Sequence, residues 1–401
     1  MYRILLVDDE EAPLTELQKE LKQISSNWDV VVATGGKQAL DVFRYQKVDI
    51  TISDLGMPGM NGVELLSLIQ AECPSCMRIA IIDPMDIHLY QNVALTAHQF
   101  IAKPWSSREV AAKIYQMHGL SNMLRQEGVQ KLVNQIGRLP SKSSAYSQLI
   151  DEFNKPDTSL DKAAAIVSTD MSMTAKLLQL VNSAYFGLPR EVHDVSQAIF
   201  YLGTDTIRDL VLSVQIFSCF EQEKLDAAGL GGLWDHSLMV AQLSRALASS
   251  ITNDKTIISS AFTAGLLHDI GKLIIGVVFK DFYSTRALVG KDSNYWLGEE
   301  IRQFESSHAD IGAYLLGLWG IPPAIQIAVS NHHSIQGYLN RGFALSVAVY
   351  FANYFAYYFS NNPLTPSFQL EPAVEENAWV KTFLDVWKAQ CERIVFPVNT
   401  A

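Results

Sequence analysis

The feature that most constrains the fold is an alternation of short apolar runs with amphipathic stretches over residues 2–117. The first run, RILLVD, is apolar almost throughout, which is typical of a strand that is buried on both faces of a sheet. The strand-like runs DVVVAT, VDITISDL, MRIAIID and QFIAK follow, and stretches with helical spacing separate them. Strands that alternate with helices form a parallel sheet covered by helices on both faces. The sequence therefore predicts a doubly wound, five-stranded parallel sheet.

The strand-like pattern ends near Gly119, and most of the remaining chain has helical periodicity interrupted by Gly and Pro. We therefore expect an α/β plus all-α protein. The expected parts are an α/β domain, a connecting helix, an all-helical domain, and a C-terminal loop and amphipathic helix that packs on the helical domain. A dimer or partner contact is the alternative role for this last helix. The corresponding ranges are residues 1–118, 119–135, 136–355 and 356–401.

Composition excludes several classes of protein. The 401 residues are 48% hydrophobic and 18% charged, as in globular proteins, and the net charge of −11 argues against an extensive nucleic-acid footprint. The N-terminus lacks the pattern of a signal peptide. The uncharged stretch FALSVAVYFANYFAYYF falls short of the ~20 apolar residues that a membrane span requires. We expect a cytoplasmic protein with neither a nucleic acid nor a membrane as its partner.

Charged side chains stand where the predicted strands end. Asp8 and Asp9 follow the first strand, Asp54 ends the third, and Lys103 follows the fifth. The carboxyl ends of parallel strands meet at one edge of a sheet, where chemistry gathers in such folds. Clustered carboxylates bind a hard cation such as Mg²⁺, an exposed carboxylate can act as a nucleophile, and a lysine can neutralise phosphoryl oxygens.

The motifs VDDE, SDLGMPGMNGVELL and FIAKPW give the first ~115 residues a close resemblance to the receiver domain of two-component response regulators. The resemblance implies that Asp54 accepts a phosphoryl group from a sensor histidine kinase. It also implies that Asp8, Asp9 and Asp54 bind Mg²⁺, that Lys103 senses the phosphoryl group, and that Phe100 is the switch aromatic residue.

The segment RIAIIDPMD departs from the receiver pattern, which has a Thr or Ser at the end of the fourth strand. That position holds Ile82, or Asp83 if the alignment slips by one, and neither donates a hydrogen bond to a phosphoryl oxygen. Two alternatives remain open. Phosphorylation switches the protein in the ordinary way, or its effect is weakened or limited to dimerisation.

Histidines form a second constellation after residue 230. Imidazoles and a carboxylate that converge from separate helices make a site for Zn, Fe or Mn. The order of these residues resembles the HD superfamily of metal-dependent phosphohydrolases, and in that reading Lys272 meets a substrate phosphate. The candidate ligands are His236, His268, Asp269, His308, His332 and His333.

The pieces STDMSMTAKLLQLVNSAYFG, AIFYLG and GLLHDIGKL narrow this resemblance to the HDOD domain, a helical relative of the HD enzymes known as a signalling output, over about residues 130–350. Two positions depart from the catalytic pattern. Asn353 stands where HD enzymes have a distal aspartate, and Gly232 stands where multinuclear HD-GYP phosphodiesterases have a glutamate. The signature that should follow the paired histidines is missing as well.

We therefore expect a response regulator whose HDOD output domain signals by binding a downstream protein rather than by turnover, and a homodimer is a further expectation. The connecting helix LSNMLRQEGVQKLVNQ is the expected lever between the domains. The alternative is a metal-dependent phosphodiesterase or phosphohydrolase, acting on a nucleotide such as a cyclic dinucleotide and gated by the receiver. A DNA-binding regulator is a weaker third reading.

Overall fold

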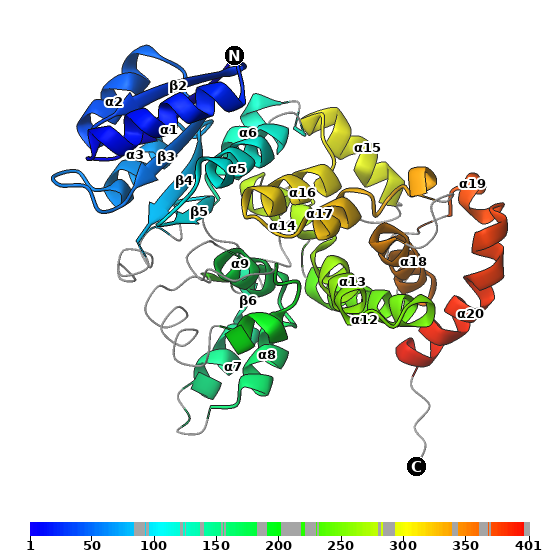
Figure 1. Ribbon diagram of the computed structural model, residues 1–401. Coiled ribbons are helices and arrows are strands. Elements are labelled where there is room, and N and C mark those ends of the chain that lie inside the picture. The colour runs from blue at the N-terminus through cyan, green and yellow to red at the C-terminus, as the bar shows by residue number, and fades with distance from the viewer. Residues whose placement is uncertain are drawn as a thin grey trace.

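The N-terminal domain is a five-stranded parallel sheet with the strand order β2-β1-β3-β4-β5 (Figure 1). The central strands are almost entirely buried because helices cover both of their faces, and β1 and β4 carry the apolar runs ILLV and IAII, whereas β3 has the sequence ITISD. The predicted doubly wound architecture is confirmed, although the helix expected near residues 87–97 lies largely outside the described residues. The elements of this domain are β1 (Tyr2–Val7), α1 (Glu11–Ile24), β2 (Trp28–Ala33), α2 (Gly36–Tyr45), β3 (Ile50–Asp54), α3 (Gly62–Glu72), β4 (Met77–Ile82), β5 (Gln99–Ala102) and α5 (Ser107–Leu120).

The structure is a computed structural model, and it describes most of the chain. The described residues are 1–83, 93, 96–120, 123–124, 126–136, 140–153, 155, 158–182, 191–201, 218–220, 230, 232–279, 282–283, 293–338, 344–360, 368 and 370–396.

The rest of the chain is mainly helical, as predicted. The helices α12, α13, α14, α16, α17 and α18 pack against one another and form the core of this region (Figure 1). The elements are α6 (Glu127–Asn134), β6 (Pro140–Lys142), α7 (Ser143–Phe153), α8 (Leu160–Val167), α9 (Met171–Val181), β7 (Ser218–Phe220), α12 (Leu233–Ile251), α13 (Lys255–Leu267), α14 (Ile270–Val278), α15 (Ser293–Phe304), α16 (His308–Leu318), α17 (Pro323–Ser330), the 3₁₀ helix η2 (Gln336–Tyr338), α18 (Leu345–Tyr358), α19 (Pro372–Glu375) and α20 (Ala378–Val395).

The expectation of one continuous connecting helix at residues 119–135 is wrong. Leu120 is the last residue of α5, and the backbone at Gln126 is extended, with φ −85° and ψ 117°, before α6 begins. Leu120 and Leu124 are buried, and α5 and α6 both contact α16. The chain turns between α5 and α6 because both helices bury apolar side chains against the helical region.

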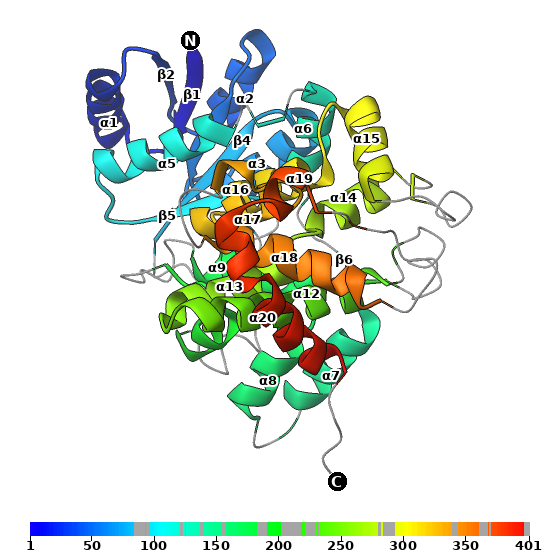
Figure 2. The ribbon, with the colours of Figure 1, turned by 90° about the vertical axis from the view of Figure 1, so that its right-hand side faces the viewer.

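Two further differences concern short elements. β6 and β7 pair in parallel, and the sequence did not predict them because three-residue strands are too short for a period to show. The amphipathic helix at the C-terminus is divided into α19 and α20, since Asn377 caps α20 by accepting hydrogen bonds from the N–H groups of Trp379 and Val380. α20 packs on α12 and α18 (Figure 2), where Trp387 is buried and its Nε1–H donates to Ser250 Oγ at 3.1 Å.

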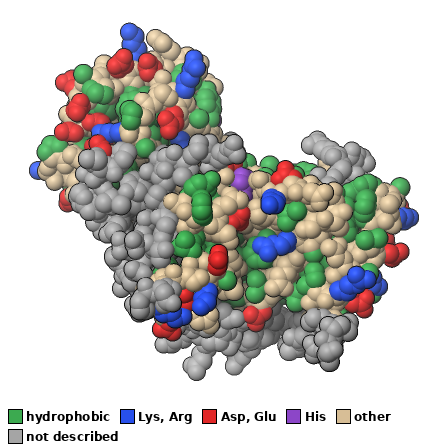
Figure 3. Space-filling model, turned by 60° about the horizontal axis from the view of Figure 1, so that its bottom comes forward, with side chains coloured by type: hydrophobic (Ala, Val, Ile, Leu, Met, Phe, Trp, Pro, Cys, Tyr) green, Lys and Arg blue, Asp and Glu red, His purple; other side chains and the backbone are tan. Residues whose placement is uncertain are grey.

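The surface shows two lobes, and their charges are interspersed (Figure 3). Among the described residues on this face, acidic and basic side chains lie side by side, and no basic patch forms. The stretch Lys255–Val278 has the length and apolar composition of a membrane span, yet 78% of its 18-residue window is buried inside the protein. The apolar stretch that ends at Phe359 forms α18, whose residues are mostly buried as well.

Gly271 of α14 lies where the backbones of two helices of the core come very close together. A Cβ atom at this position would collide with the carbonyl oxygen of His308, the first residue of α16. Only glycine therefore lets α14 and α16 pack at this distance.

We expect Gly271→Ala to lower the free energy of unfolding by about 1–3 kcal/mol, because the added methyl group must displace backbone in a packed core. Urea denaturation of the full chain measures the change. The matched control is Gly128→Ala in α6, where an added Cβ has no neighbour within 4 Å and stability should stay the same or rise slightly. Equal stability of the Gly271 variant and the parent would contradict this packing.

Candidate phosphoryl-acceptor and metal sites

Three carboxylates meet at the carboxyl edge of the N-terminal sheet. Asp8 and Asp9 follow β1, and Asp54 is the last residue of β3. One oxygen from each lies within 4.8 Å of the others, so together they can hold a divalent cation. Asp9 is exposed, whereas Asp8 and Asp54 are nearly buried. Burial, reinforced by the charge of Asp54, raises the pKa of Asp8, so a bound cation would favour its ionised form.

Lys103, which follows β5, reaches the same edge. Its Nζ lies 2.5 Å from Asp54 Oδ1 and 3.9 Å from Asp8 Oδ2. Burial alone would lower the pKa of Lys103, but its hydrogen bond to Asp54 and the charges of Asp54 and Asp8 raise it. The ammonium group therefore stays protonated beside the candidate acceptor. The N–H of Gly56 donates to the other oxygen of Asp54 at 2.9 Å, which orients the carboxylate.

The candidate switch positions lie next to this cluster. Ile82 is the last residue of β4 and is fully buried, and its carbonyl oxygen accepts the N–H of Lys103 at 2.9 Å. Asp83 follows it and is exposed. Phe100, the second residue of β5, is buried in the core. This strand end therefore offers no hydroxyl group from Ile82 or Asp83, as the sequence indicated.

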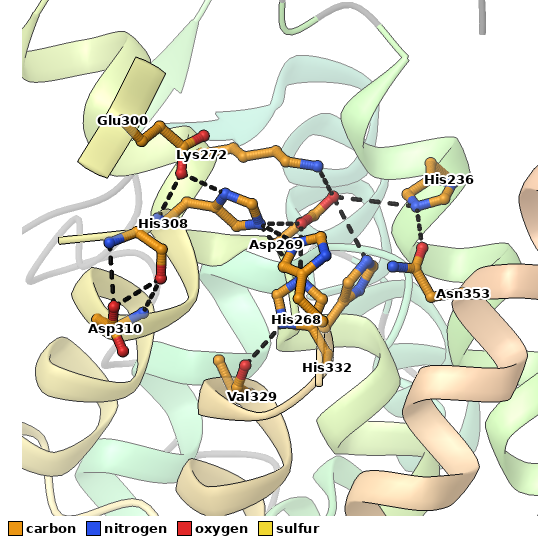
Figure 4. A network of polar contacts seen from close by, with 12 residues as sticks. His236, His268, Asp269, Lys272, Glu300, His308, Asp310, Val329, His332 and Asn353 are labelled. Carbon is orange, nitrogen blue, oxygen red and sulfur yellow. Dashed lines mark hydrogen bonds and ion pairs between the residues drawn. The ribbon is translucent and has the colours of Figure 1, made fainter. Parts of the chain in front are cut away.

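The six candidate metal ligands come together in the helical region, and Figure 4 labels all of them except His333, whose Nε2 lies next to His308. Four separate parts of the chain contribute these ligands: the first turn of α12, the junction of α13 and α14, the start of α16 and the turn that follows α17. Their imidazoles surround one buried carboxylate, that of Asp269. We call the residues His236, His268, Asp269, His308, His332 and His333 the histidine cluster.

Backbone carbonyls set the tautomers of two of these imidazoles. His268 Nδ1 lies 2.7 Å from Gly265 O, and His332 Nδ1 lies 2.7 Å from Val329 O. A carbonyl oxygen only accepts, so we assign the proton to Nδ1 in both rings, and Nε2 keeps its lone pair. This is the arrangement by which proteins aim histidine ligands at a metal.

The cluster divides into two groups that share Asp269. In the first, Asp269 Oδ2 lies 3.4 Å from His268 Nε2 and 3.9 Å from His236 Nε2. We call this the α12-side group. In the second, Asp269 Oδ1 lies 3.3 Å from His308 Nε2 and 3.6 Å from His332 Nε2. His333 Nε2 is 2.9 Å from His308 Nε2, and we call this second set the α16-side group.

The donor set fits a cation. Among the described residues, His268 Nε2 and Asp269 Oδ1 are buried atoms without a hydrogen-bond partner, and both face the interior of the cluster. His308 Nε2 and His332 Nε2 are only 3.2 Å apart, so two neutral imidazoles would set lone pair against lone pair there. A cation between His308 and His332, either a metal ion or a proton on His308, would separate these two lone pairs and give Asp269 Oδ1 a partner.

Electrostatics in the cluster favour an ionised Asp269 and mostly neutral imidazoles. Burial alone would raise the pKa of Asp269, but neighbouring His268 and Lys272 hold it well below its usual range. Lys272 Nζ is 2.7 Å from Asp269 Oδ2, and despite burial the carboxylate raises the pKa of Lys272. Burial lowers the pKa of His236 to about 3 and those of His332 and His333 well below the ordinary value.

Glu300 is a residue of the site that the sequence did not reveal. Its Oε2 accepts both the backbone N–H and the Nδ1–H of His308, each at 2.7 Å, and its Oε1 accepts the hydroxyl of Tyr283 at 2.5 Å. Burial opposes protonation of His308, yet the charge of Glu300 raises the pKa of His308. No motif marks Glu300, because α15 contributes it from a stretch of ordinary helical composition.

The two departures from the HD pattern also have defined places. Asn353, in the middle of α18, puts its Oδ1 3.0 Å from His236 Nε2, so an amide does occupy the position beside this histidine (Figure 4). Gly232 is the N-cap of α12, and its Cα faces open space. The rings of Tyr357 and Phe368 lie nearby, with Tyr357 4.7 Å from His236 and Phe368 6.0 Å from His333 between ring centroids.

Comparison with known families agrees with this architecture. Residues 4–115 match the response regulator receiver domain, and residues 139–335 match the HDOD domain. The chain therefore consists of a receiver domain followed by an HDOD domain. It is built as a response regulator with an HDOD output domain.

Individual relatives cover parts of the chain. A protein described as uncharacterized from Treponema pallidum (strain Nichols) is 26% identical over 55% of this chain and 42% of its own length. The alkaline phosphatase synthesis transcriptional regulatory protein PhoP of Bacillus subtilis (strain 168) is 33% identical over 28% of this chain and 46% of its own length. The chain thus spans less than half of the length of these two relatives.

Among solved structures, the MmoQ response regulator from Methylococcus capsulatus str. Bath matches with 21% identity and a TM-score of 0.48. The match covers 64% of this chain and 93% of that chain.

The lowered pKa values of three histidines in the cluster predict a specific pH dependence of stability. His236, His332 and His333 stay neutral in the folded protein but take up protons in the unfolded chain below pH ~6.5. The unfolded state then binds more protons, so stability falls as the pH decreases. The raised pKa of His308 acts in the opposite sense, because it stabilises the fold at low pH and loses its effect as the pH rises through that pKa.

We therefore expect the free energy of unfolding of the metal-free protein to decrease from pH 7.5 to pH 5.5, because several lowered pKa values outweigh one raised value. Each of these neutral histidines contributes at most about 1.4 kcal/mol for each pH unit below its unfolded pKa. Urea denaturation in the presence of a chelator at several pH values measures the slope. Stability that is constant or rises on acidification would contradict the assigned protonation states.

Proposed function

We propose that phosphorylation of Asp54 in the receiver domain controls an HDOD domain that signals by binding a downstream protein. A receiver domain implies a phosphodonor such as a histidine kinase. In the transfer, an Asp54 carboxylate oxygen forms a bond to phosphorus while the bond between phosphorus and the donor's nitrogen breaks. The observation that carries this proposal is the 2.5 Å contact between Lys103 Nζ and Asp54 beside two further carboxylates.

Each receiver residue has a role that its position supports. Asp8, Asp9 and Asp54 would hold Mg²⁺, which neutralises charge on the phosphoryl oxygens when it is bound. Lys103 would keep its ammonium group on the phosphoryl group after transfer. Ile82 has no hydroxyl group that could bind the phosphoryl group. Phosphorylation would therefore change the conformation of the domain mainly through Lys103, and thus through β5, which ends at the preceding residue.

We infer that the histidine cluster holds one metal ion, in the α16-side group. There, three imidazoles and Asp269 Oδ1 make a donor set that suits Zn²⁺, Fe²⁺ or Mn²⁺. In the α12-side group, the ammonium of Lys272 already neutralises Asp269 Oδ2. The amide oxygen of Asn353 only accepts, so it favours a proton on His236 Nε2, which removes that ligand.

This asymmetry supports an output by binding rather than by catalysis. A metal-activated water that attacks phosphorus requires an open coordination position and charge compensation around it. Within the cluster, the side chains of Asp269 and His308 are at most 2% exposed, and Asn353 supplies no charge. The metal would then organise the helices that meet at the cluster, and the helical surface would carry the signal to a protein partner.

One observation favours the second candidate, a metal-dependent phosphodiesterase or phosphohydrolase. The side chains of His236 and Lys272 are each 19% exposed, so the α12-side group has an opening with a cation beside it. A phosphate group of a substrate could reach Lys272 from that side.

The remaining proposals concern the context of the protein. The sensor kinase and the downstream protein act in the cytoplasm, and the protein forms a homodimer in one of its states. As domain boundaries we propose residues 1–118 for the receiver, 119–135 for the link that contains α6, 136–355 for the HDOD domain and 356–401 for the C-terminal segment.

Phosphorylation can be tested directly. We expect the purified chain to gain one phosphoryl group on incubation with acetyl phosphate and Mg²⁺, and Asp54→Asn to gain none, since the amide cannot act as the nucleophile. Intact-mass spectrometry measures the gain. Asp41→Asn, which changes an exposed acid on α2, is the matched control and should behave like the parent. Equal labelling of the Asp54 variant would place the acceptor elsewhere.

Metal content tests the histidine cluster. We expect about one Zn, Fe or Mn ion per chain after purification without chelator, and almost none in a His308→Ala, His332→Ala double variant. Asn353→Asp should raise the content toward about two ions, because it adds an anionic ligand beside His236. Plasma mass spectrometry measures the metal, with His118→Ala on α5 and Asn27→Asp in the receiver as controls.

Absence of metal from the parent would overturn the proposed metal site and leave the cluster as a hydrogen-bonded core. Metal-dependent hydrolysis of a phosphodiester such as bis(p-nitrophenyl) phosphate by the parent, lost in the His308→Ala, His332→Ala variant, would favour the enzyme instead.

A further inference from the structure

α16 has one end in the histidine cluster and the other end against the receiver domain. It begins at His308 and ends at Leu318, a length of about 15 Å at 1.5 Å per residue. Every residue of α16 except Asp310 is buried, and Ser307 and Asp310 form a capping box at its start. A buried, capped helix of this length moves as one body, so a shift at one end reaches the other.

The receiver end of α16 is held by polar and steric contacts. Gln99 Nε2 donates to the carbonyl oxygen of Gly317 at 3.2 Å, and Tyr314 OH donates to Asn134 Oδ1 at 2.8 Å. A Cβ atom on Gly317 would collide with the side chain of Leu120 from α5, so the two helices are in close contact. A displacement of β5 or α5 would therefore displace this end of α16 as well.

A buried cation fixes Asn134 to the receiver sheet. The guanidinium of Arg78 in β4 is 1% exposed and donates to the carbonyl oxygens of Cys76, Thr96 and Asn134. The Arg78–Asn134 contact is 2.6 Å, and His98 Nε2 lies 2.9 Å from the same carbonyl oxygen. Sliding this interface would take the Asn134 carbonyl oxygen away from one N–H group of a buried guanidinium, while the bonds to Cys76 and Thr96 remain, so the contact resists gradual deformation.

On the receiver side, β5 leads directly to the acceptor. Gln99 is the first residue of β5, Ala102 is the last, and Lys103 comes next with its Nζ 2.5 Å from Asp54. The strand is thus a four-residue connection between the acceptor edge and the contact with Gly317. The covalent link is a poorer connection, because its backbone is extended at Gln126.

At the other end, α16 positions His308. Glu300 binds both the backbone N–H and the Nδ1 of this residue, and Gly271 packs against its carbonyl oxygen. His308 Nε2 lies 3.3 Å from Asp269 Oδ1 and 3.2 Å from His332 Nε2, and both partners belong to other elements. A small displacement of α16 therefore changes the geometry of the α16-side group.

We propose that β5 and α16 couple the two sites, so that the phosphoryl state of Asp54 changes the metal affinity of the α16-side group, and metal binding changes the affinity for the phosphoryl group by the same factor. The inference rests on the proposed function, since it regulates the metal site proposed above. Thermodynamic linkage requires that each ligand change the affinity for the other by the same factor. Allosteric couplings typically change affinities about 5- to 150-fold.

The experiment uses the full chain with Zn²⁺ and with beryllofluoride plus Mg²⁺ as the phosphoryl mimic. Zn²⁺ affinity is measured by chelator competition with and without beryllofluoride, and beryllofluoride affinity is measured with and without Zn²⁺. We expect both ratios to differ from one by about five-fold or more and to equal each other. Hydrogen–deuterium exchange of residues 300–312 on addition of beryllofluoride, in chelator, is a second readout that needs no metal.

Two variants break the connection without touching either site. Gln99→Ala removes the hydrogen bond to Gly317, and Tyr314→Phe removes the one to Asn134. Each should bring the two affinity ratios toward one and reduce the exchange response, while Zn²⁺ and beryllofluoride still bind. Tyr45→Phe is the matched control at an exposed position of α2 and should keep the parent's ratios.

The outcomes separate the two proposals. Zn²⁺ binding that is identical with and without beryllofluoride, with no change in exchange, overturns the coupling and leaves the metal site intact. Absence of Zn²⁺ binding overturns the metal site, and the exchange response alone then decides whether the receiver reaches α16. Retention of the full ratios in both variants overturns the path through β5 and α16.

Discussion

The arrangement of the helices in the helical domain depends on the interactions that compensate the buried charge of Asp269. An isolated charge in such a place costs several kcal/mol, so the surrounding helices must supply compensation. Lys272 compensates one oxygen from the next turn of its own helix, while His308 and His332 approach the other from different elements. Because the ligands come from α12, α13, α16 and α17, the arrangement of these helices and the charge of the cluster determine each other.

This dependence bears on the single metal ion proposed for the histidine cluster. Asn353 places a neutral amide beside His236, where the HD resemblance implies an aspartate, and Lys272 balances much of the charge of Asp269. The set left over, three imidazoles and one carboxylate oxygen, suits a single ion better than two. A cluster of this kind holds helices in place without needing an open coordination position.

The receiver meets the helical domain through a buried polar contact as well. The contact between Arg78 and Asn134 resists partial rearrangement because it satisfies an N–H group of a buried cation, and a buried donor that loses its acceptor is costly. The molecule thus has two rigid polar centres, and α16 runs from the neighbourhood of one to the other. Two such centres joined by a packed helix favour discrete arrangements over continuous deformation.

The sequence by itself determined the two domains and most of the candidate residues. The spacing of apolar residues distinguishes the α/β region from the all-helical region. Because the carboxyl ends of parallel strands meet at one edge of a sheet, it also follows that Asp8, Asp54 and Lys103 lie at the same edge. Only the tertiary structure showed that Glu300 binds His308 and that β6 pairs with β7. It also showed that the backbone is extended at Gln126 and that Gln99 donates a hydrogen bond to α16. Those features depend on contacts between residues far apart in the chain, and local periodicity carries no information about such contacts.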